Sequence, residues 1–202
     1  IQTISLHLYE SGFFPGTGSL QENKAPGLVN IPMMHGLNDK YLYVILLKII
    51  IPLIDKHNPQ VIVIQSGGDG LLGDKYDEWQ LSIRGLAHSI MRIINKFTDS
   101  HVIILGGGGY NELIMSRFNT YLTWQIVKKY SSSANIQQTK DLLSNDFDCL
   151  IPEHEFSELY AEDNYKYWIY EQPGSTRYRT LRDNNTPTMI KQCISTIRDA
   201  LN

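Results

Sequence analysis

The sequence predicts an α/β fold built on a parallel sheet. Two short apolar runs, residues 60–65 and 101–105, are rich in β-branched residues, and each ends in a glycine-rich stretch. A segment with apolar residues at helical spacing follows each of these stretches. This repeated order of strand, loop and helix is typical of a sheet whose parallel strands are joined by helices. Ligands bind beyond the carboxyl ends of such strands, so the two loops are the first candidates for a site.

The first elements follow from local composition. We expect a strand at Thr3–Leu8, which ends in a loop rich in Gly and Pro at Ser11–Gly18. A second, short strand is expected at Val29–Ile31. From Asp39 to about His57 the apolar spacing predicts a largely buried helix, which Pro52 should kink or end because proline lacks the N–H of the helical ladder.

The two long apolar runs are predicted to be interior strands. Gln60–Gln65 and His101–Leu105 are apolar almost without interruption, which is typical of strands buried on both faces of a parallel sheet. Ser82 is placed to cap a helix over residues 83–97. A further helix is expected from about residue 111 to residue 130.

The last third of the chain is less regular. Ser131–Asn145 is polar and predicts a loop, whereas Thr188–Leu201 has the apolar spacing of an amphipathic helix. We divide the chain into residues 1–170, which carry the α/β pattern, and a C-terminal tail over residues 171–202 that contains this helix.

Composition excludes several classes of protein. The 202 residues are 42% hydrophobic and 19% charged, which excludes global disorder. The formal net charge of −3 does not suit a surface that binds nucleic acid directly. Cys149 and Cys193 are too few for a disulfide framework, so a reducing compartment is expected. The longest apolar run, Val44–Ile54, falls short of the roughly 20 residues that span a bilayer, and no membrane partner is expected.

The chain starts at Ile1 and runs directly into the first predicted strand, with no leader before it. We therefore expect that it is a soluble piece of a larger protein.

Asp69 stands among glycines directly after the first long apolar run, in Gly67-Gly-Asp-Gly70. Small neighbours let a ligand approach a carboxylate closely, and carboxylate oxygens bind hard and borderline cations. Aspartate is also common in turns at strand ends. From this pattern alone a metal ligand and a turn residue are about equally supported.

Tyr110 follows four consecutive glycines after the second long run. A tyrosine hydroxyl on such a loop is able to donate a hydrogen bond to a developing oxyanion. The alternative, a tight turn with the ring packed on the next helix, is favoured on spacing alone. The loop has neither the G-x-G-x-x-G pattern nor the Lys-Ser/Thr of a P-loop, so the sequence gives only weak support for a nucleotide-binding site.

Other candidates lie near the start of the chain. Phe13 and Phe14 form an aromatic pair in the first glycine-rich loop, where they either line a pocket or anchor the loop. Ser5 and His7 alternate along the first strand, and for His7 a hydrogen-bonded interior histidine is favoured over a metal ligand. One aspartate cannot hold a zinc ion alone, because zinc requires three or four ligands.

Taken together, four stretches resemble the class I histone deacetylases in order and spacing: residues 3–7, 12–18, 67–74 and 105–110. The resemblance extends through residues 117–124 and 151–156 and covers most of residues 1–170. It is most similar to the budding-yeast Hos-type branch in residues 67–74 and 168–171. It implies the arginase/deacetylase fold, a three-layer arrangement around a parallel sheet, with this chain as the C-terminal half.

In that family a zinc ion held by two aspartates and a histidine activates water to attack the acetyl-lysine amide. The resemblance implies that Asp69 is one of the zinc ligands. Tyr110 matches the tyrosine that hydrogen-bonds the amide carbonyl and stabilises the oxyanion. Ser5 and Leu6 match contributors to a structural monovalent-cation site, in which K⁺ is expected.

The resemblance also assigns the substrate tunnel. Phe14 matches an aromatic wall around the methylene groups of the lysine, and Tyr76 matches another lining residue. Gly108 matches a loop glycine that touches the lysine chain near the carbonyl.

This sequence departs from the family pattern in three respects. One is a conservative change in size, because the family's small or Cys residue before Ala-Asp is changed in Ser66-Gly67-Gly68-Asp69. The family's Asp-x-His pair, which supplies two zinc ligands, and its His-His pair, which serves as general base and electrostatic partner, lie upstream of the part matched here. The basic residues that hold an inositol phosphate at corepressor interfaces are only partly matched, because Lys75 fits one position and Leu113 stands where the family has an arginine.

The function implied is zinc-dependent hydrolysis of the acetyl amide of acetyl-lysine in histones or other chromatin proteins, cohesin among them. Acetylated proteins and a corepressor complex are the expected partners, and the nucleus, with the cytoplasm as a second site, the expected location. Because the first zinc ligands lie upstream, we expect the chain alone to be inactive.

Three alternatives remain: a non-catalytic scaffold module with the deacetylase fold, a flavodoxin-like domain that binds a phosphate, and a hydrolase of acetylpolyamines. Retention of both Asp69 and Tyr110 argues against the scaffold. Residues 106–110 hold no basic residue and no Ser or Thr, which argues against a phosphate site.

Overall fold

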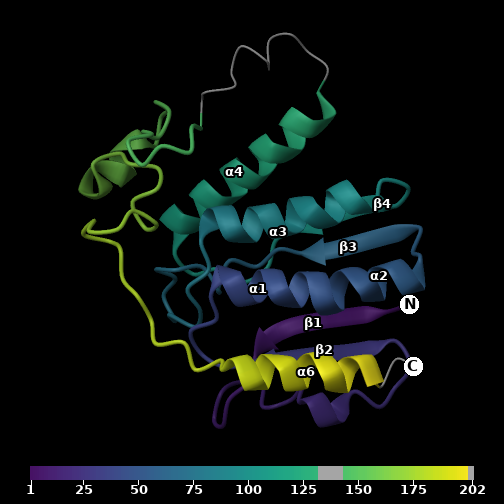
Figure 1. The fold of residues 1–202 in the computed structure, drawn as a ribbon. Coiled ribbons are helices and arrows are strands. Elements are labelled where there is room, and N and C mark those ends of the chain that lie inside the picture. The colour runs from purple at the N-terminus through teal and green to yellow at the C-terminus, as the bar shows by residue number, and fades with distance from the viewer. Residues whose placement is uncertain (132–142, 200–202) are drawn as a thin grey trace.

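The computed structural model describes residues 1–131 and 143–199 and places helices in a layer in front of parallel strands (Figure 1). The strands are β1 (Thr3–Leu8), β2 (Leu28–Met33), β3 (Val61–Gln65) and β4 (His101–Leu105). The α-helices are α1 (Asp39–Ile45), α2 (Ile51–His57), α3 (Ile83–Lys96), α4 (Glu112–Tyr130) and α6 (Pro187–Asp199). Three shorter helical segments complete the order: η1 (Leu20–Glu22), η2 (Leu46–Ile50) and η3 (Ser157–Asp163).

The predicted α/β class with parallel strands is confirmed, but the strands form two separate pairs. β1 pairs with β2 in parallel, and β3 pairs with β4 in parallel. Within the described residues no ladder joins the two pairs into the single sheet that the sequence suggested. Apolar runs determine which segments become strands, whereas strand pairing depends on contacts between distant segments, which local composition does not encode.

The predicted helix over residues 39–57 is interrupted, as Pro52 suggested. α1 passes into the π-helical segment η2, and α2 begins at Ile51 with Pro52 in its first turn. Proline has no N–H to donate to the preceding turn, and a π-helical turn widens the ladder at that point. The side chains of Ile45, Leu46 and Ile49 remain buried across the interruption, so the helix keeps its contact with the core.

The β3–β4 pair is covered on one face only by the described residues. Ile62 is buried, and Ile64 and Ile104 pack against the hydrophobic core. On the opposite face Val63 is 58% exposed and Ile103 is 50% exposed. The prediction of strands buried on both faces is therefore wrong for this part of the molecule, because the described helices cover one side of these strands.

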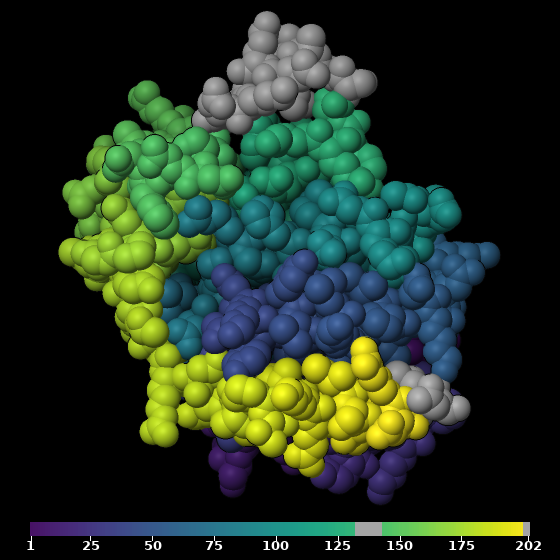
Figure 2. Space-filling view, viewed as in Figure 1, coloured from purple at the N-terminus to yellow at the C-terminus, as the bar shows by residue number. Residues whose placement is uncertain are grey.

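The C-terminal tail returns the chain to the first helices. α6 lies along α1 and the η2 segment (Figures 1 and 2), with Ile190, Cys193 and Ile197 buried beneath it. The predicted amphipathic helix is confirmed as far as residue 199, where the described part ends. The predicted loop Ser131–Asn145 falls mostly on residues 132–142, which lie outside the described residues. None of the described helices is long and apolar enough to cross a membrane.

A buried ion pair fixes the segment that follows α4. The Arg117 guanidinium, 2% exposed, donates to Asp163 Oδ2 at 2.7 Å and stacks 4.7 Å from the centre of the Tyr160 ring. Arg177 Nε donates to the other oxygen of Asp163 at 2.7 Å. These contacts hold η3 against α4.

We predict that Arg117→Met lowers the free energy of unfolding by about 3 kcal/mol, because removal of one partner leaves a buried charge short of compensation. The matched control is Lys96→Met, which breaks the exposed pair between Lys96 and Asp55 and should cost less than about 1 kcal/mol. Urea unfolding measures both variants. Equal losses would contradict the structural role of the Arg117 ion pair.

Candidate active site

A cavity of about 650 Å³ lies at the carboxyl ends of β1, β3 and β4. It brings together six of the seven residues singled out in the sequence: Ser5, Leu6, Phe14, Asp69, Tyr76 and Tyr110. The seventh, Gly108, lies beside Asp69 without lining the cavity. The loops that follow the two long apolar runs therefore meet at one site, as expected for parallel strands.

Asp69 sits where the two glycine-rich loops touch. A Cβ atom at Gly108 would lie 2.6 Å from Asp69 Oδ2, and one at Gly67 would lie 2.9 Å from Asp69 Oδ1. The Gly68 N–H donates to the Gly108 carbonyl at 2.7 Å, which joins the loops directly. Only glycine permits this approach, so these two positions set the place of the carboxylate.

The electrostatic surroundings of Asp69 favour its neutral form. Burial raises the pKa of the Asp69 carboxyl, and the nearby Asp74 carboxylate raises it further. No ion pair with a basic side chain compensates Asp69 among the described residues. A cation bound at this carboxylate would supply the missing compensation.

Asp74 holds Tyr110 in position. Its carboxylate is almost fully buried, and Oδ1 accepts hydrogen bonds from the backbone N–H groups of Tyr110 at 2.6 Å and Asn111 at 3.2 Å. The other oxygen accepts from the N–H of Tyr76 at 3.3 Å. Asn111 caps α4 and also donates from Nδ2 to the Gly73 carbonyl at 3.0 Å. The loop that carries Tyr76 is thereby tied to the loop that carries Tyr110.

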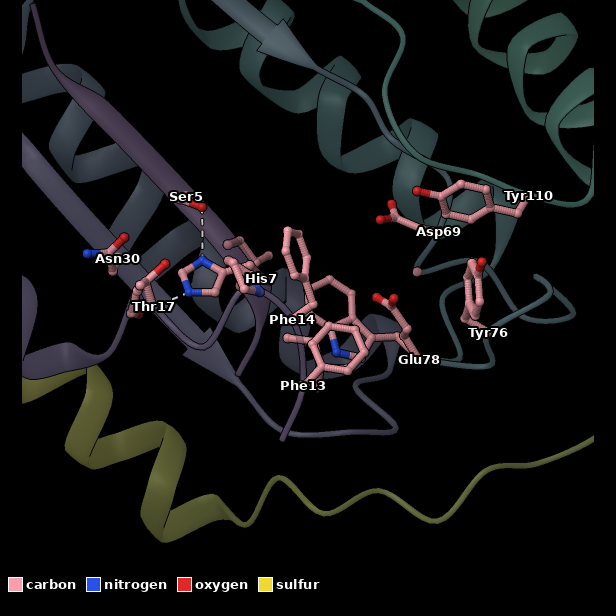
Figure 3. Close-up of a pocket in the computed structure, with 16 residues that line it drawn as sticks. Ser5, His7, Phe13, Phe14, Thr17, Asn30, Asp69, Tyr76, Glu78 and Tyr110 are labelled. Carbon is pink, nitrogen blue, oxygen red and sulfur yellow. Dashed lines mark hydrogen bonds between the residues drawn. The ribbon is translucent and has the colours of Figure 1, made fainter. Parts of the chain in front are cut away.

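The aromatic side chains stand at the edges of the cavity. Tyr76 and Tyr110 meet edge to face with ring centres 4.9 Å apart. Figure 3 shows the Tyr110 hydroxyl directed toward the Asp69 carboxylate, with Phe14 across the cavity. Phe14 is 87% exposed, so within the described residues it forms one wall and has no facing wall close to it.

The opposite end of the cavity is organised by His7. Its Nε2 lies 3.0 Å from the Gly18 carbonyl and must donate to it, so Nδ1 accepts from the Ser5 hydroxyl at 2.9 Å. Both ring nitrogens are engaged in hydrogen bonds, as expected for a hydrogen-bonded histidine. Leu6 lies between these two residues in β1 and also lines the cavity.

Sequence reasoning missed Asp74 as a positioning residue and Glu78 as a lining residue. Both lie in a polar stretch with Lys75 and Asp77, which has the composition of a solvated loop. Burial raises the pKa of the Glu78 carboxyl to about 7, and the nearby Asp69 and Asp74 carboxylates add to the shift, whereas His35 opposes it.

Asp69 is the candidate metal ligand that the sequence analysis named, and its surroundings can be compared with what zinc requires. Asp69 offers carboxylate oxygens at a glycine-lined position, which fits a zinc ligand. Among residues 1–131 and 143–199 no group of three or more His, Cys, Asp or Glu side chains is close enough to hold a metal ion. Asp-x-His sequences occur at residues 55–57 and 99–101, but the first lies at the end of α2 and the second at the start of β4, both outside the cavity lining.

Comparison with known proteins identifies the family. The sequence pattern of the histone deacetylase domain matches residues 1–126. Histone deacetylase HOS1 of Saccharomyces cerevisiae is 50% identical over 193 residues, which are 92% of this chain and 41% of that protein. Histone deacetylase 8 of Xenopus tropicalis is 28% identical over 205 residues, covering the whole chain and 48% of the relative. Histone deacetylase B of Dictyostelium discoideum is 35% identical over 127 residues, which are 61% of the chain and 30% of the relative.

The chain belongs to the histone deacetylase family. The expected resemblance to class I and to its Hos-type branch is confirmed by these relatives. The chain spans about half the length of the curated relatives it matches.

We predict that Asp74→Ala lowers the free energy of unfolding by about 2–3 kcal/mol, because buried N–H groups of the Tyr110 loop lose their acceptor. It should also shift the amide resonance of Tyr110 and raise its rate of hydrogen exchange. Thermal unfolding and ¹⁵N NMR measure the two effects.

Asp146→Ala is the matched control, since the exposed Asp146 also accepts a backbone N–H, from Asp148 at 3.1 Å. It should cost less than about 1 kcal/mol, because water replaces an exposed partner. An unchanged Tyr110 amide in Asp74→Ala would show that Asp74 does not position this loop.

Proposed function

We propose that this chain carries part of the active site of a zinc-dependent protein lysine deacetylase, which hydrolyses the acetyl amide of acetyl-lysine in histones or other chromatin proteins. The observation that supports it is the convergence of Asp69 and Tyr110 at one cavity. The family to which the chain belongs supplies the reaction class.

Each residue has a role that follows from its place. Asp69 would hold the zinc ion through its carboxylate, and zinc supplies polarisation of the amide carbonyl and activation of water. The Tyr110 hydroxyl would donate a hydrogen bond to the carbonyl oxygen as negative charge develops there. Phe14 and Tyr76 would flank the methylene chain of the lysine, and Gly108 leaves room for that chain beside Asp69.

The remaining zinc ligands would come from polypeptide beyond this chain, as would the catalytic histidines. The half-exposed face of Val61, Val63, Ile103 and Leu105 supports this part of the proposal, since parallel strands are ordinarily covered on both faces. The buried Trp79 Nε1, which lacks an acceptor among the described residues, supports it as well. In the complete protein the two strand pairs would join one sheet between two helical layers, and the chain alone would be inactive.

The remaining expectations are part of the same proposal. Residues 1–170 would form the C-terminal part of the catalytic domain and residues 171–202 its tail. Ser5 and Leu6 would contribute to a K⁺ site. Acetylated histones, cohesin or other chromatin proteins would be substrates in the nucleus, with the cytoplasm as a second location, and a corepressor complex would be a partner in transcriptional repression.

We predict that Asp69→Asn abolishes hydrolysis of an acetyl-lysine peptide, because the metal loses a charged ligand. Tyr110→Phe should lower kcat by about 10²–10³ with little change in KM, because the hydroxyl acts mainly on the transition state. The assay uses the full-length natural protein that contains this chain, supplied with zinc.

The controls are Asp99→Asn and Tyr130→Phe, two exposed positions outside the cavity, which should leave kcat unchanged. The 202-residue chain alone should give no turnover. Near-normal rates in Asp69→Asn and Tyr110→Phe would refute the site assignment, and a fully inactive natural protein would favour the non-catalytic scaffold.

A further inference from the structure

A second cavity, of about 510 Å³, opens on the helical layer, where α1 and η2 run beside α6. Figures 1 and 2 show these helices at the front of the molecule, with the strands behind them. The uncovered side chains of β3 and β4 lie on the other side of the strands, so polypeptide that covers them would not lie over this cavity. We call it the α6 groove, and its lining residues are Val44, Lys48, Lys191, Ile194, Ser195, Arg198 and Asp199.

One wall of the α6 groove is a single stripe of α6. Lys191, Ile194 and Arg198 are spaced three and four residues apart, which places them on the same side of the helix. This wall therefore presents a cation, an apolar side chain and a second cation in order. The side chains that α6 buries in the core are different ones: Ile190, Cys193 and Ile197.

The opposite wall repeats the combination of apolar and basic side chains. Val44 of α1 and Lys48 of η2 are four residues apart. Val44 and Ile194 are only partly buried and rest on the hydrophobic core, so they form an apolar floor that is still open to solvent. Lys48, like the two cations of α6, is exposed. The groove thus has an apolar centre and a basic rim.

The α6 groove is basic although the chain as a whole is acidic. The chain has a formal net charge of −3, whereas the groove has three basic residues and one acidic residue, Asp199. None of the three cations forms an ion pair within the described residues. Lys96 of the neighbouring α3 differs, since it pairs with Asp55 at 3.0 Å. Carboxylates of a partner would therefore meet several uncompensated cations at once.

The apolar floor favours an acidic protein segment over a phosphate. Phosphate groups gain nothing from Val44 and Ile194, and the Ser195 hydroxyl already donates to the Gln192 carbonyl at 3.0 Å. A segment with an apolar side chain between two acidic ones uses both the floor and the rim. Burial of the apolar side chain would supply affinity, and the charges would fix the orientation.

We propose that the α6 groove is a docking site for an acidic helical segment of a partner protein. An apolar side chain of that segment would rest on Val44 and Ile194, and its carboxylates would pair with Lys191 and Arg198. The spacing along α6 predicts acid, apolar and acid residues three or four positions apart in the partner helix. This inference goes beyond the proposed deacetylase function and does not depend on it.

The test uses the full-length natural protein and an alanine-rich helical peptide with the pattern Glu-x-x-Leu-x-x-x-Glu, labelled with fluorescein. Two control peptides carry glutamine in place of both glutamates or alanine in place of leucine. Fluorescence anisotropy at low salt should show that each control binds about tenfold more weakly, and added salt should weaken binding of the acidic peptide. Equal binding of the three peptides would overturn the proposal.

Variants of the protein test the basic rim. Lys191→Gln and Arg198→Gln should each weaken binding of the acidic peptide about threefold, because each removes one exposed ion pair. The matched control is Lys128→Gln, which removes an exposed charge from α4 outside the groove and should leave binding unchanged. The same loss in all three variants would show a general effect of charge and would contradict docking in the groove.

A blocking variant tests the groove itself without changing its charge. Ser195→Trp should fill the groove and weaken peptide binding at least about tenfold. Thr196→Trp is the control, since Thr196 is the next residue of α6, is exposed and does not line the groove. Equal affinity of wild type and Ser195→Trp would overturn the proposal. Binding of single-stranded DNA or phosphatidylserine vesicles through Lys191 and Arg198, without peptide binding, would also overturn it.

Activity measurements separate this proposal from the proposed function. Hydrolysis of an acetyl-lysine peptide should be unchanged in Ser195→Trp, because the groove is remote from the cavity that holds Asp69 and Tyr110. Peptide binding by a natural protein without deacetylase activity would refute the proposed function and leave the docking site standing. Deacetylase activity without peptide binding would do the reverse.

Discussion

The site depends on one buried hydrogen bond, from the backbone N–H of Tyr110 to the carboxylate of Asp74, 36 residues apart in sequence, at 2.6 Å. Glycine-rich loops have large conformational entropy, and four glycines precede Tyr110. A charged acceptor in the interior offsets part of that entropy and brings the loop against Asp69. The bond between Gly68 and Gly108 then sets the spacing of the two loops. Without Asp74, the loop of Tyr110 would lose its charged acceptor, and the Gly68–Gly108 and Asn111–Gly73 bonds would remain to hold it near the Asp69 carboxylate.

The loops of the candidate site are held firmly in place, but the candidate metal site is incomplete. The contacts of Asp74, Asn111 and His7 that position the site lie inside the described residues, whereas those residues hold no group of three or more side chains that could bind a metal ion. The β3–β4 pair is incomplete in the same way, because the described residues cover only one of its two apolar faces. Both features support the proposal that further polypeptide covers these strands and completes the metal site.

Local sequence patterns predicted much of this fold. β1 and β4 occupy the residues expected from their apolar runs, and Asp69 and Tyr110 were expected at strand ends because parallel topology brings these ends together. Local patterns could not predict how the strands pair, which strand faces are buried, or where Asp74 and Glu78 lie. Each of these depends on segments that meet only after folding. Glu78 illustrates this limit, since the polar stretch around it predicts a solvated loop, whereas its carbonyl accepts the N–H of Gly36, 42 residues earlier in the chain, and its side chain lines the cavity.

The central claim is that Asp69 binds the metal beside Tyr110. The most direct measurement is an anomalous difference map at the zinc absorption edge, from crystals of the full-length natural protein that contains this chain. The account predicts one strong peak about 2.0–2.2 Å from a carboxylate oxygen of Asp69, on the side of the cavity that the Tyr110 hydroxyl faces. Stoichiometric zinc located elsewhere, with no peak at Asp69, would contradict it.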